Sequence, residues 1–138
     1  MKFIAGEWIR SADIDMEAIE ELKHKENLTP LVSFHAQQVI EKVFKAILEQ
    51  NEVHVPRSHK LADLYKIVLK FTSIILEPTE NDVMDKLDQL YIETRYPSDL
   101  GLMPHGRPSV DDVEQFYILA KRIYTEVVNC LNMGTVSN

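Results

Sequence analysis

Apolar residues recur at steps of three and four along most of the chain, which is the spacing of one face of an α-helix. The clearest stripe lies near the C-terminus, where Ser109 and Asp112 give a helix-capping signal just ahead of it. Its members are Val113, Phe116, Tyr117, Ala120, Ile123, Tyr124, Val127 and Leu131. This pattern predicts a long last helix. No segment alternates with period two for long enough to predict a strand.

Two long helices are expected at the start of the chain. The first covers residues 6–25 with one apolar stripe, and the second covers residues 31–50, after a break at Asn27–Pro30. The second has a broad apolar surface formed by Ala36, Val39, Ile40, Val43, Phe44, Ile47 and Leu48. Such a width is typical of the central helix of a bundle.

Two further helices are expected between the second and the last. Ser58 is placed to cap a third helix. The apolar stripe of this helix is formed by Leu61, Leu64, Tyr65, Val68 and Phe71. A fourth helix is predicted to begin at a capping box of Thr79 and Asp82 and to stop before Pro97.

Five helices with mostly short connections predict an all-α fold, an antiparallel up-and-down helical bundle of about five helices. The 138 residues are enough for one domain and leave no room for a second core. We therefore expect a single domain over residues 1–132, followed by a frayed tail at residues 133–138.

Composition and charge narrow the function classes. The net charge of −7 argues against broad binding to a nucleic-acid backbone, which needs many Lys and Arg side chains, although a local basic pocket is compatible with it. The lone Cys130 falls within an apolar stripe and suits a reducing compartment. No stretch approaches the roughly 18 apolar residues of a membrane helix, so we expect a cytoplasmic protein.

The second helix carries a polar face of unusual composition. His35, Gln38, Lys42 and Lys45 follow one another at steps of three and four, so they share one side of the helix. This face is either an ordinary solvated surface or a site for an anionic group, with the two lysines facing phosphate. Glu41 instead falls on the apolar side, where a carboxylate requires a cation or several donors, and it predicts a structural ion pair.

Arg95 lies where the fourth helix meets a proline turn at Pro97. An arginine at this position can bind phosphate bidentately. It can equally cap the last carbonyls of its own helix or pair with Asp99.

The five histidines do not predict a metal site. No two of them stand four residues apart on one helix, and a Cys-x-x-Cys motif is absent from the sequence. The sequence also lacks a glycine-rich phosphate loop and a nucleophile elbow. We therefore expect neither a metal nor a cofactor.

Four segments together resemble a known family. They contain Trp8 with Ala12–Asp13, the run from Phe34 to Leu48 with its Gln-Gln-x-x-Glu-Lys-x-x-Lys-Ala core, Pro56–Leu61, and Tyr91–Pro97. In order and spacing they resemble the HEPN domain, the higher eukaryotes and prokaryotes nucleotide-binding family. The similarity spans nearly the whole chain.

The resemblance implies a helical bundle, often a homodimer, that is frequently paired with a minimal nucleotidyltransferase, in some cases as a toxin–antitoxin system. Many members resemble metal-independent ribonucleases that use an arginine followed after four to six residues by a histidine. Arg95 matches that arginine, but the next histidine is His105, with nine residues intervening.

This departure favours an accessory module that binds an ATP-like nucleotide or a nucleotidyltransferase partner, with His35, Gln38, Lys42, Lys45 and Arg95 as the binding residues. The alternative is a metal-independent ribonuclease that acts on RNA. In that case Arg95 and either His105 or His35 would be catalytic.

Overall fold

The chain folds into five α-helices in a computed structural model that describes the backbone of residues 1–95 and 107–136 and the side chains of residues 1–91 and 107–132. The elements are α1 (Phe3–Leu22), a short 3₁₀ turn η1 (Glu26–Leu28), α2 (Thr29–Gln50), α3 (Leu61–Val68), α4 (Pro78–Arg95) and α5 (Val110–Val136). The described residues contain no strand. The predicted all-α bundle is therefore confirmed.

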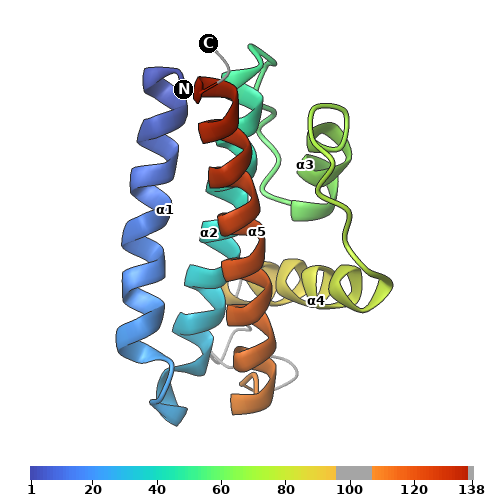
Figure 1. Ribbon diagram of the computed structural model, residues 1–138. Helices are drawn as coiled ribbons and strands as arrows, with labels where there is room; N and C mark the ends of the chain where they lie inside the picture. The colour runs from blue at the N-terminus through green and yellow to red at the C-terminus, as the bar shows by residue number, and fades with distance from the viewer. Residues whose placement is uncertain (96–106, 137–138) are drawn as a thin grey trace.

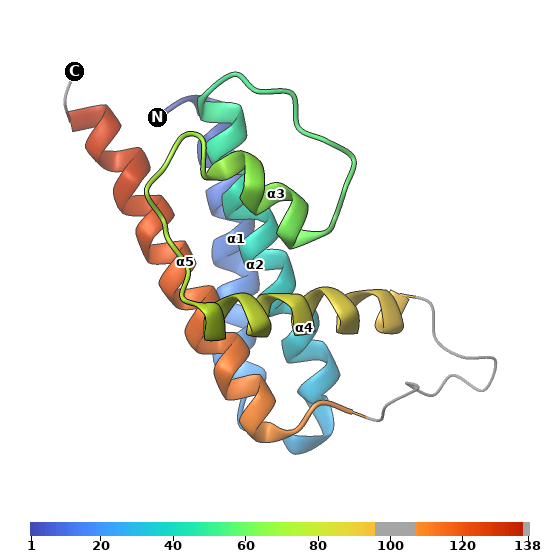
Figure 2. The same cartoon turned by 90° about the vertical axis from the view of Figure 1, so that its right-hand side faces the viewer.

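Helices α1, α2 and α5 stand side by side and form the body of the molecule (Figure 1). α1 runs opposite to α2 and α5, so the start of α1 and the end of α5 lie at the same end of the bundle. Helix α4 departs from this alignment and crosses the other helices steeply (Figure 2). Its first half packs against α5, and its C-terminal end projects past α2 on the far side.

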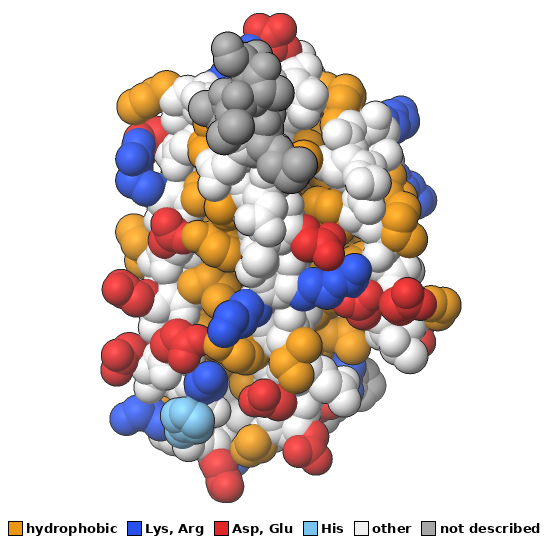
Figure 3. Space-filling model, in the orientation of Figure 1, with side chains coloured by type: hydrophobic (Ala, Val, Ile, Leu, Met, Phe, Trp, Pro, Cys, Tyr) orange, Lys and Arg blue, Asp and Glu red, His pale blue; other side chains and the backbone are white. Residues whose placement is uncertain are grey.

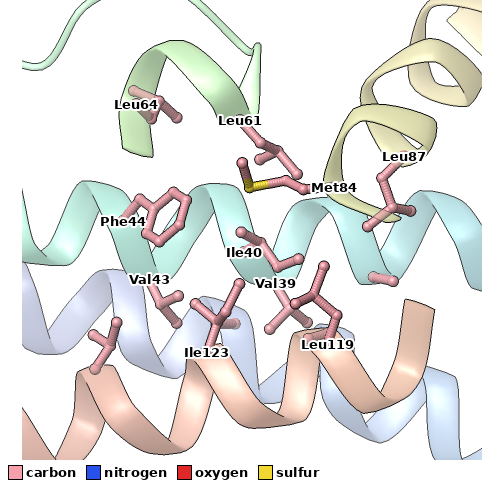
Figure 4. Packing of buried hydrophobic residues seen from close by; sticks show 14 of the residues in the cluster. Val39, Ile40, Val43, Phe44, Leu61, Leu64, Met84, Leu87, Leu119 and Ile123 are labelled. Atoms are coloured by element: carbon pink, nitrogen blue, oxygen red, sulfur yellow. The ribbon is translucent and has the colours of Figure 1, made fainter. Parts of the chain in front are cut away.

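Helix α2 is the centre of the core, because it contacts every other helix. Its buried face meets Leu61 and Leu64 of α3, Met84 and Leu87 of α4, and α5 (Figure 4). The stripe predicted for α2 is fully or almost fully buried throughout: Ala36, Val39, Ile40, Val43, Phe44, Ile47 and Leu48. The broad apolar surface predicted for α2 thus reflects the central position of this helix in the core. Over the described part of the chain, no helix is both long and apolar enough to cross a membrane.

Several helix ends differ from the predictions. α1 begins at Phe3 and ends at Leu22, three residues earlier than expected at each end. α2 includes Pro30, which was assigned to the break, because a proline in the first helical turn sacrifices no hydrogen bond. α4 begins at Pro78 and not after a Thr79 cap. At this end of the helix, the Glu80 carboxylate accepts a hydrogen bond from the backbone N–H of Glu77 at 2.8 Å.

The start of α3 differs most from its prediction. Ser58 does not cap the helix, which begins at Leu61, and the Ser58 hydroxyl instead accepts from the Lys60 N–H at 3.1 Å. Asp88, a buried residue of α4, accepts from the backbone N–H groups of Leu61 at 2.8 Å and Ala62 at 3.2 Å. A carboxylate from α4 therefore caps the first turn of α3.

The end of α3 differs from its prediction, whereas the start of α5 agrees with it. α3 stops at Val68, so Phe71 lies outside the helix and remains 40% exposed. At the start of α5, Ser109 and Asp112 exchange two hydrogen bonds of 3.0 Å, as the capping signal predicted. α5 continues through Val136, four residues past the expected boundary at residue 132.

Candidate functional site

The polar face of α2 is held in place by an acidic residue of α1. Asp15 is buried, and its two carboxylate oxygens accept from His35 Nδ1 at 2.8 Å and from Lys42 Nζ at 2.7 Å. Because an ionised carboxylate can only accept, the proton of His35 lies on Nδ1, and Nε2 is left for other partners. The charge of Lys42 is compensated by Asp15.

A second carboxylate, Glu41, lies on α2 itself, next to Lys42 in the sequence. Glu41 is buried and accepts from Lys45 Nζ at 2.7 Å, from Gln37 Nε2 at 3.0 Å and from His59 Nδ1 at 3.1 Å. Burial raises the pKa of the Glu41 carboxyl, but the hydrogen bonds from Lys45, Gln37 and His59 outweigh burial and lower the pKa below its ordinary value. Glu41 is therefore ionised. Together with its three donors, Lys45, Gln37 and His59, it forms the Glu41 cluster.

The contacts of Lys45 and Gln38 do not match those expected of a shared phosphate-binding surface. The Lys45 ammonium is buried against Glu41 and also lies 5.4 Å from the centre of the Trp8 ring. Gln38 donates through Nε2 to Gln37 Oε1 at 2.7 Å. Of the four residues predicted on this face, His35 and Lys42 share one carboxylate, whereas Lys45 belongs to the Glu41 cluster.

The loop before α3 joins this cluster through His59. Gln37 Nε2 also donates to the backbone carbonyl of His59 at 3.0 Å, so both the backbone and the imidazole of His59 are anchored to α2. The His59 side chain nevertheless remains 45% exposed. Its Nδ1 donates to Glu41, and its Nε2 is therefore the nitrogen available for a ligand.

Aromatic rings connect the two histidines. Phe34 stacks on Tyr91 of α4 with ring centres 6.3 Å apart, and the His59 ring lies 5.9 Å from Tyr91. Phe34 also meets the His35 ring edge-on, with ring centres 5.4 Å apart. Phe34 is 36% exposed, so the surface presents an aromatic face between two imidazoles, each oriented by a buried carboxylate.

Arg95 is the last residue of α4, one helical turn beyond Tyr91. Its side chain lies outside the described residues, and so does His105. The phosphate contact expected of Arg95, and the catalytic role of either residue under the ribonuclease alternative, rest on the sequence alone.

Sequence reasoning missed five members of this site: Asp15, Phe34, Gln37, His59 and Tyr91. Asp15 carried a usable signal, because it stands three residues after Ala12 and four before Ile19, within the buried stripe of α1. A carboxylate at such a position demands partners. Gln37 also carried a signal, because it stands four residues before Glu41 on the same helix. Tyr91 carried none, since its ring contacts with Phe34 and His59 join segments far apart in the chain. Among the described residues, no group of three His, Cys, Asp or Glu side chains is arranged to hold a metal ion.

Comparison with known proteins agrees with this architecture. The HEPN domain family matches residues 5–131, which is most of the chain. A solved structure of an archaeal HEPN homologue superposes with a TM-score of 0.67, covering 94% of this chain and 98% of the other, at 24% sequence identity. No curated protein matches the chain at a significant level. The helical bundle and the family match together show that this protein belongs to the HEPN domain family.

Proposed function

We propose that this HEPN protein is a nucleotide-binding accessory module whose ligand lies against the aromatic face formed by Phe34, Tyr91, His35 and His59. The observation that carries the proposal is the arrangement of two imidazoles, the half-buried His35 and the exposed His59, on either side of a stacked Phe34–Tyr91 pair. Each imidazole is held through Nδ1 by a buried carboxylate. A nucleobase gains from stacking on such a ring, and phosphate oxygens accept from protonated imidazoles.

Charge compensation defines which groups attract the phosphates. Asp15 neutralises Lys42 and Glu41 neutralises Lys45, so neither lysine is a free cation. The positive charge then comes from His35 and His59 when they are protonated, and from Arg95 beyond Tyr91.

The proposed protein partner follows from the proposed binding of a nucleotide. A module that holds a nucleotide without catalytic machinery of its own suits a role beside a small nucleotidyltransferase, as the family resemblance implies. We include this partner in the proposal, as well as a cytoplasmic location and a homodimer.

A second candidate function is metal-independent RNA cleavage, and one observation favours it. The Glu41–His59 pair orients an exposed imidazole through its Nδ1, and no described residue is hydrogen-bonded to its Nε2, which is the geometry of a general base. His59 is then a stronger candidate for the acid–base residue than His105 or His35, the two proposed from the sequence.

Calorimetric titration with ATP tests the proposed function. We expect weak to moderate binding that declines as salt rises, because the phosphate contacts are electrostatic. Replacing Phe34→Ala should weaken binding by about tenfold, since stacking contributes roughly 1 kcal/mol or more, whereas Phe71→Ala, at a similarly exposed phenylalanine, should not. Arg95→Ala should likewise weaken binding more than Arg10→Ala on α1.

The same preparation, incubated with RNA in the presence of a chelator, separates the two functions. Absent or very slow cleavage together with ATP binding supports the accessory module. No detectable ATP binding, combined with cleavage that disappears in His59→Ala and persists in His54→Ala, would replace it with the ribonuclease.

A further inference from the structure

Helix α3 and the loop before it carry an excess of positive charge. Between Glu52 and Glu77 the sequence has four lysine and arginine residues and a single carboxylate, Asp63. This excess contrasts with the net charge of −7 for the whole chain. All four cationic residues are exposed, and we call them the basic α3 surface: Arg57, Lys60, Lys66 and Lys70.

The charge of the basic α3 surface is available to a ligand. Among the described residues, none forms an ion pair with any of its four members. Most of the other described lysines and arginines do have a carboxylate partner, for example Lys2, Lys42 and Lys86. Lysine and arginine side chains project over α3 in the view of Figure 3, whereas elsewhere in that view they lie among acidic ones. An anion at α3 therefore has no carboxylate to displace from these cations.

The basic α3 surface begins beside the proposed nucleotide site. His59, whose ring lies 5.9 Å from Tyr91, directly precedes Lys60. Gln37 donates to the backbone carbonyl of His59 at 3.0 Å, and the two carboxylate oxygens of Asp88 accept from the first two N–H groups of α3. The backbone on both sides of Lys60 is therefore fixed next to the aromatic face.

From this point the cations follow α3 away from the aromatic face. The helix starts beside α4 and runs away from it (Figures 1 and 2). Lys66 and Lys70 lie one turn apart on its exposed side. The eight residues of α3 span about 12 Å, so the positive charge forms a short line that leads outward from His59.

We infer that the phosphate chain of the ligand runs along this line, so that the site takes a nucleoside polyphosphate in preference to a monophosphate. The inference rests on the proposed function, which places the ligand against Phe34 and Tyr91. The phosphate next to the nucleoside then lies at His59, and the following phosphates lie at Lys60 and towards Lys66. Each added phosphate places negative charge near a cation that has no carboxylate partner, so affinity rises with the number of phosphates.

The shortness of the line favours a nucleoside polyphosphate over a nucleic-acid strand. A strand gains its affinity by neutralising many phosphates along a continuous basic surface. Here the excess of positive charge ends with α3, and the next charged residues of the chain that are exposed include Glu77, Asp82 and Asp85. A strand that continued past α3 would meet these carboxylates, whereas a single phosphate chain ends before them.

Calorimetric titration with AMP, ADP and ATP, in the presence of a chelator that removes divalent cations, tests the inference. Affinity should rise from AMP through ADP to ATP, by at least about tenfold over the series. The double variant Lys60→Gln/Lys66→Gln should lose about tenfold in ATP affinity and less than about twofold in AMP affinity, because the single phosphate of AMP lies at His59. Lys25→Gln is the matched control, since Lys25 is exposed but lies in the connection between α1 and α2, and it should keep the wild-type ratio of ATP to AMP affinity.

The outcomes separate this inference from the proposed function. Equal affinities for AMP and ATP, or a ratio that persists in the double variant, would overturn the inference and leave the nucleotide site in place. If neither nucleotide binds, the proposed function is wrong, and titration with inorganic tripolyphosphate decides the rest: binding that the double variant loses supports a polyphosphate site at α3, and no binding overturns it. A single-stranded oligoadenylate that binds more tightly than ATP, and that Lys70→Gln weakens, would replace the nucleoside polyphosphate with a nucleic-acid strand.

Discussion

Glu41 shows how one buried carboxylate organises the residues around it. Lys45, Gln37 and His59 all donate to it, so its removal leaves a buried ammonium without a counter-charge. We expect Glu41→Gln to lower the free energy of unfolding by about 1–3 kcal/mol more than Glu17→Gln, at an exposed position of α1. Urea unfolding at pH 7 measures the difference. Equal losses in the two variants would show that the Glu41 cluster contributes no net stability.

The pH dependence of stability follows from the same residue. The pKa of Glu41 lies below its ordinary value of 4.5 in the folded protein, so the folded state binds the proton more weakly than the unfolded state does. Its contribution is therefore complete above pH 4.5 and is lost as the pH falls through the depressed pKa. The stability difference between the wild type and Glu41→Gln should shrink in urea titrations between pH 6 and pH 3. A difference that grows on acidification would contradict the assignment.

At the scale of elements, α3 depends on α4 for its first turn. Asp88 accepts from the N–H groups of Leu61 and Ala62, and these bonds persist although burial raises the pKa of its carboxyl. Removing the acceptor with Asp88→Ala should cost about 1–2 kcal/mol and should speed amide exchange in α3. Asp85→Ala, at an exposed position of the same helix, is the control. Unchanged exchange in α3 would show that its first turn is held by packing alone.

At the scale of the whole molecule, α4 links a groove on α5 to the proposed nucleotide site. Its first turns border the groove beside Ile118, and its last turns carry Tyr91 towards Phe34 and His59. Because α4 crosses the bundle, its two ends lie on different sides of the molecule (Figure 2).

The sequence by itself determined the number of helices, their order and their buried faces. Hydrophobic periodicity is a local property, and the stripes of α2 and α5 enter the core as the spacing predicted. The cap of α5 was also predictable, because Ser109 and Asp112 are three residues apart.

Only the tertiary structure decided which polar groups from separate segments of the chain meet. Asp15 joins His35 and Lys42 across 20 and 27 residues, and Glu41 joins His59 across 18. The cap that Asp88 provides for α3 spans 27 residues. Such contacts depend on how the helices pack, and local spacing does not encode them. The polar face that looks basic along α2 is charge-compensated in the fold. Packing against α1 places Asp15 beside Lys42, whereas Glu41 pairs with Lys45 one turn away within α2.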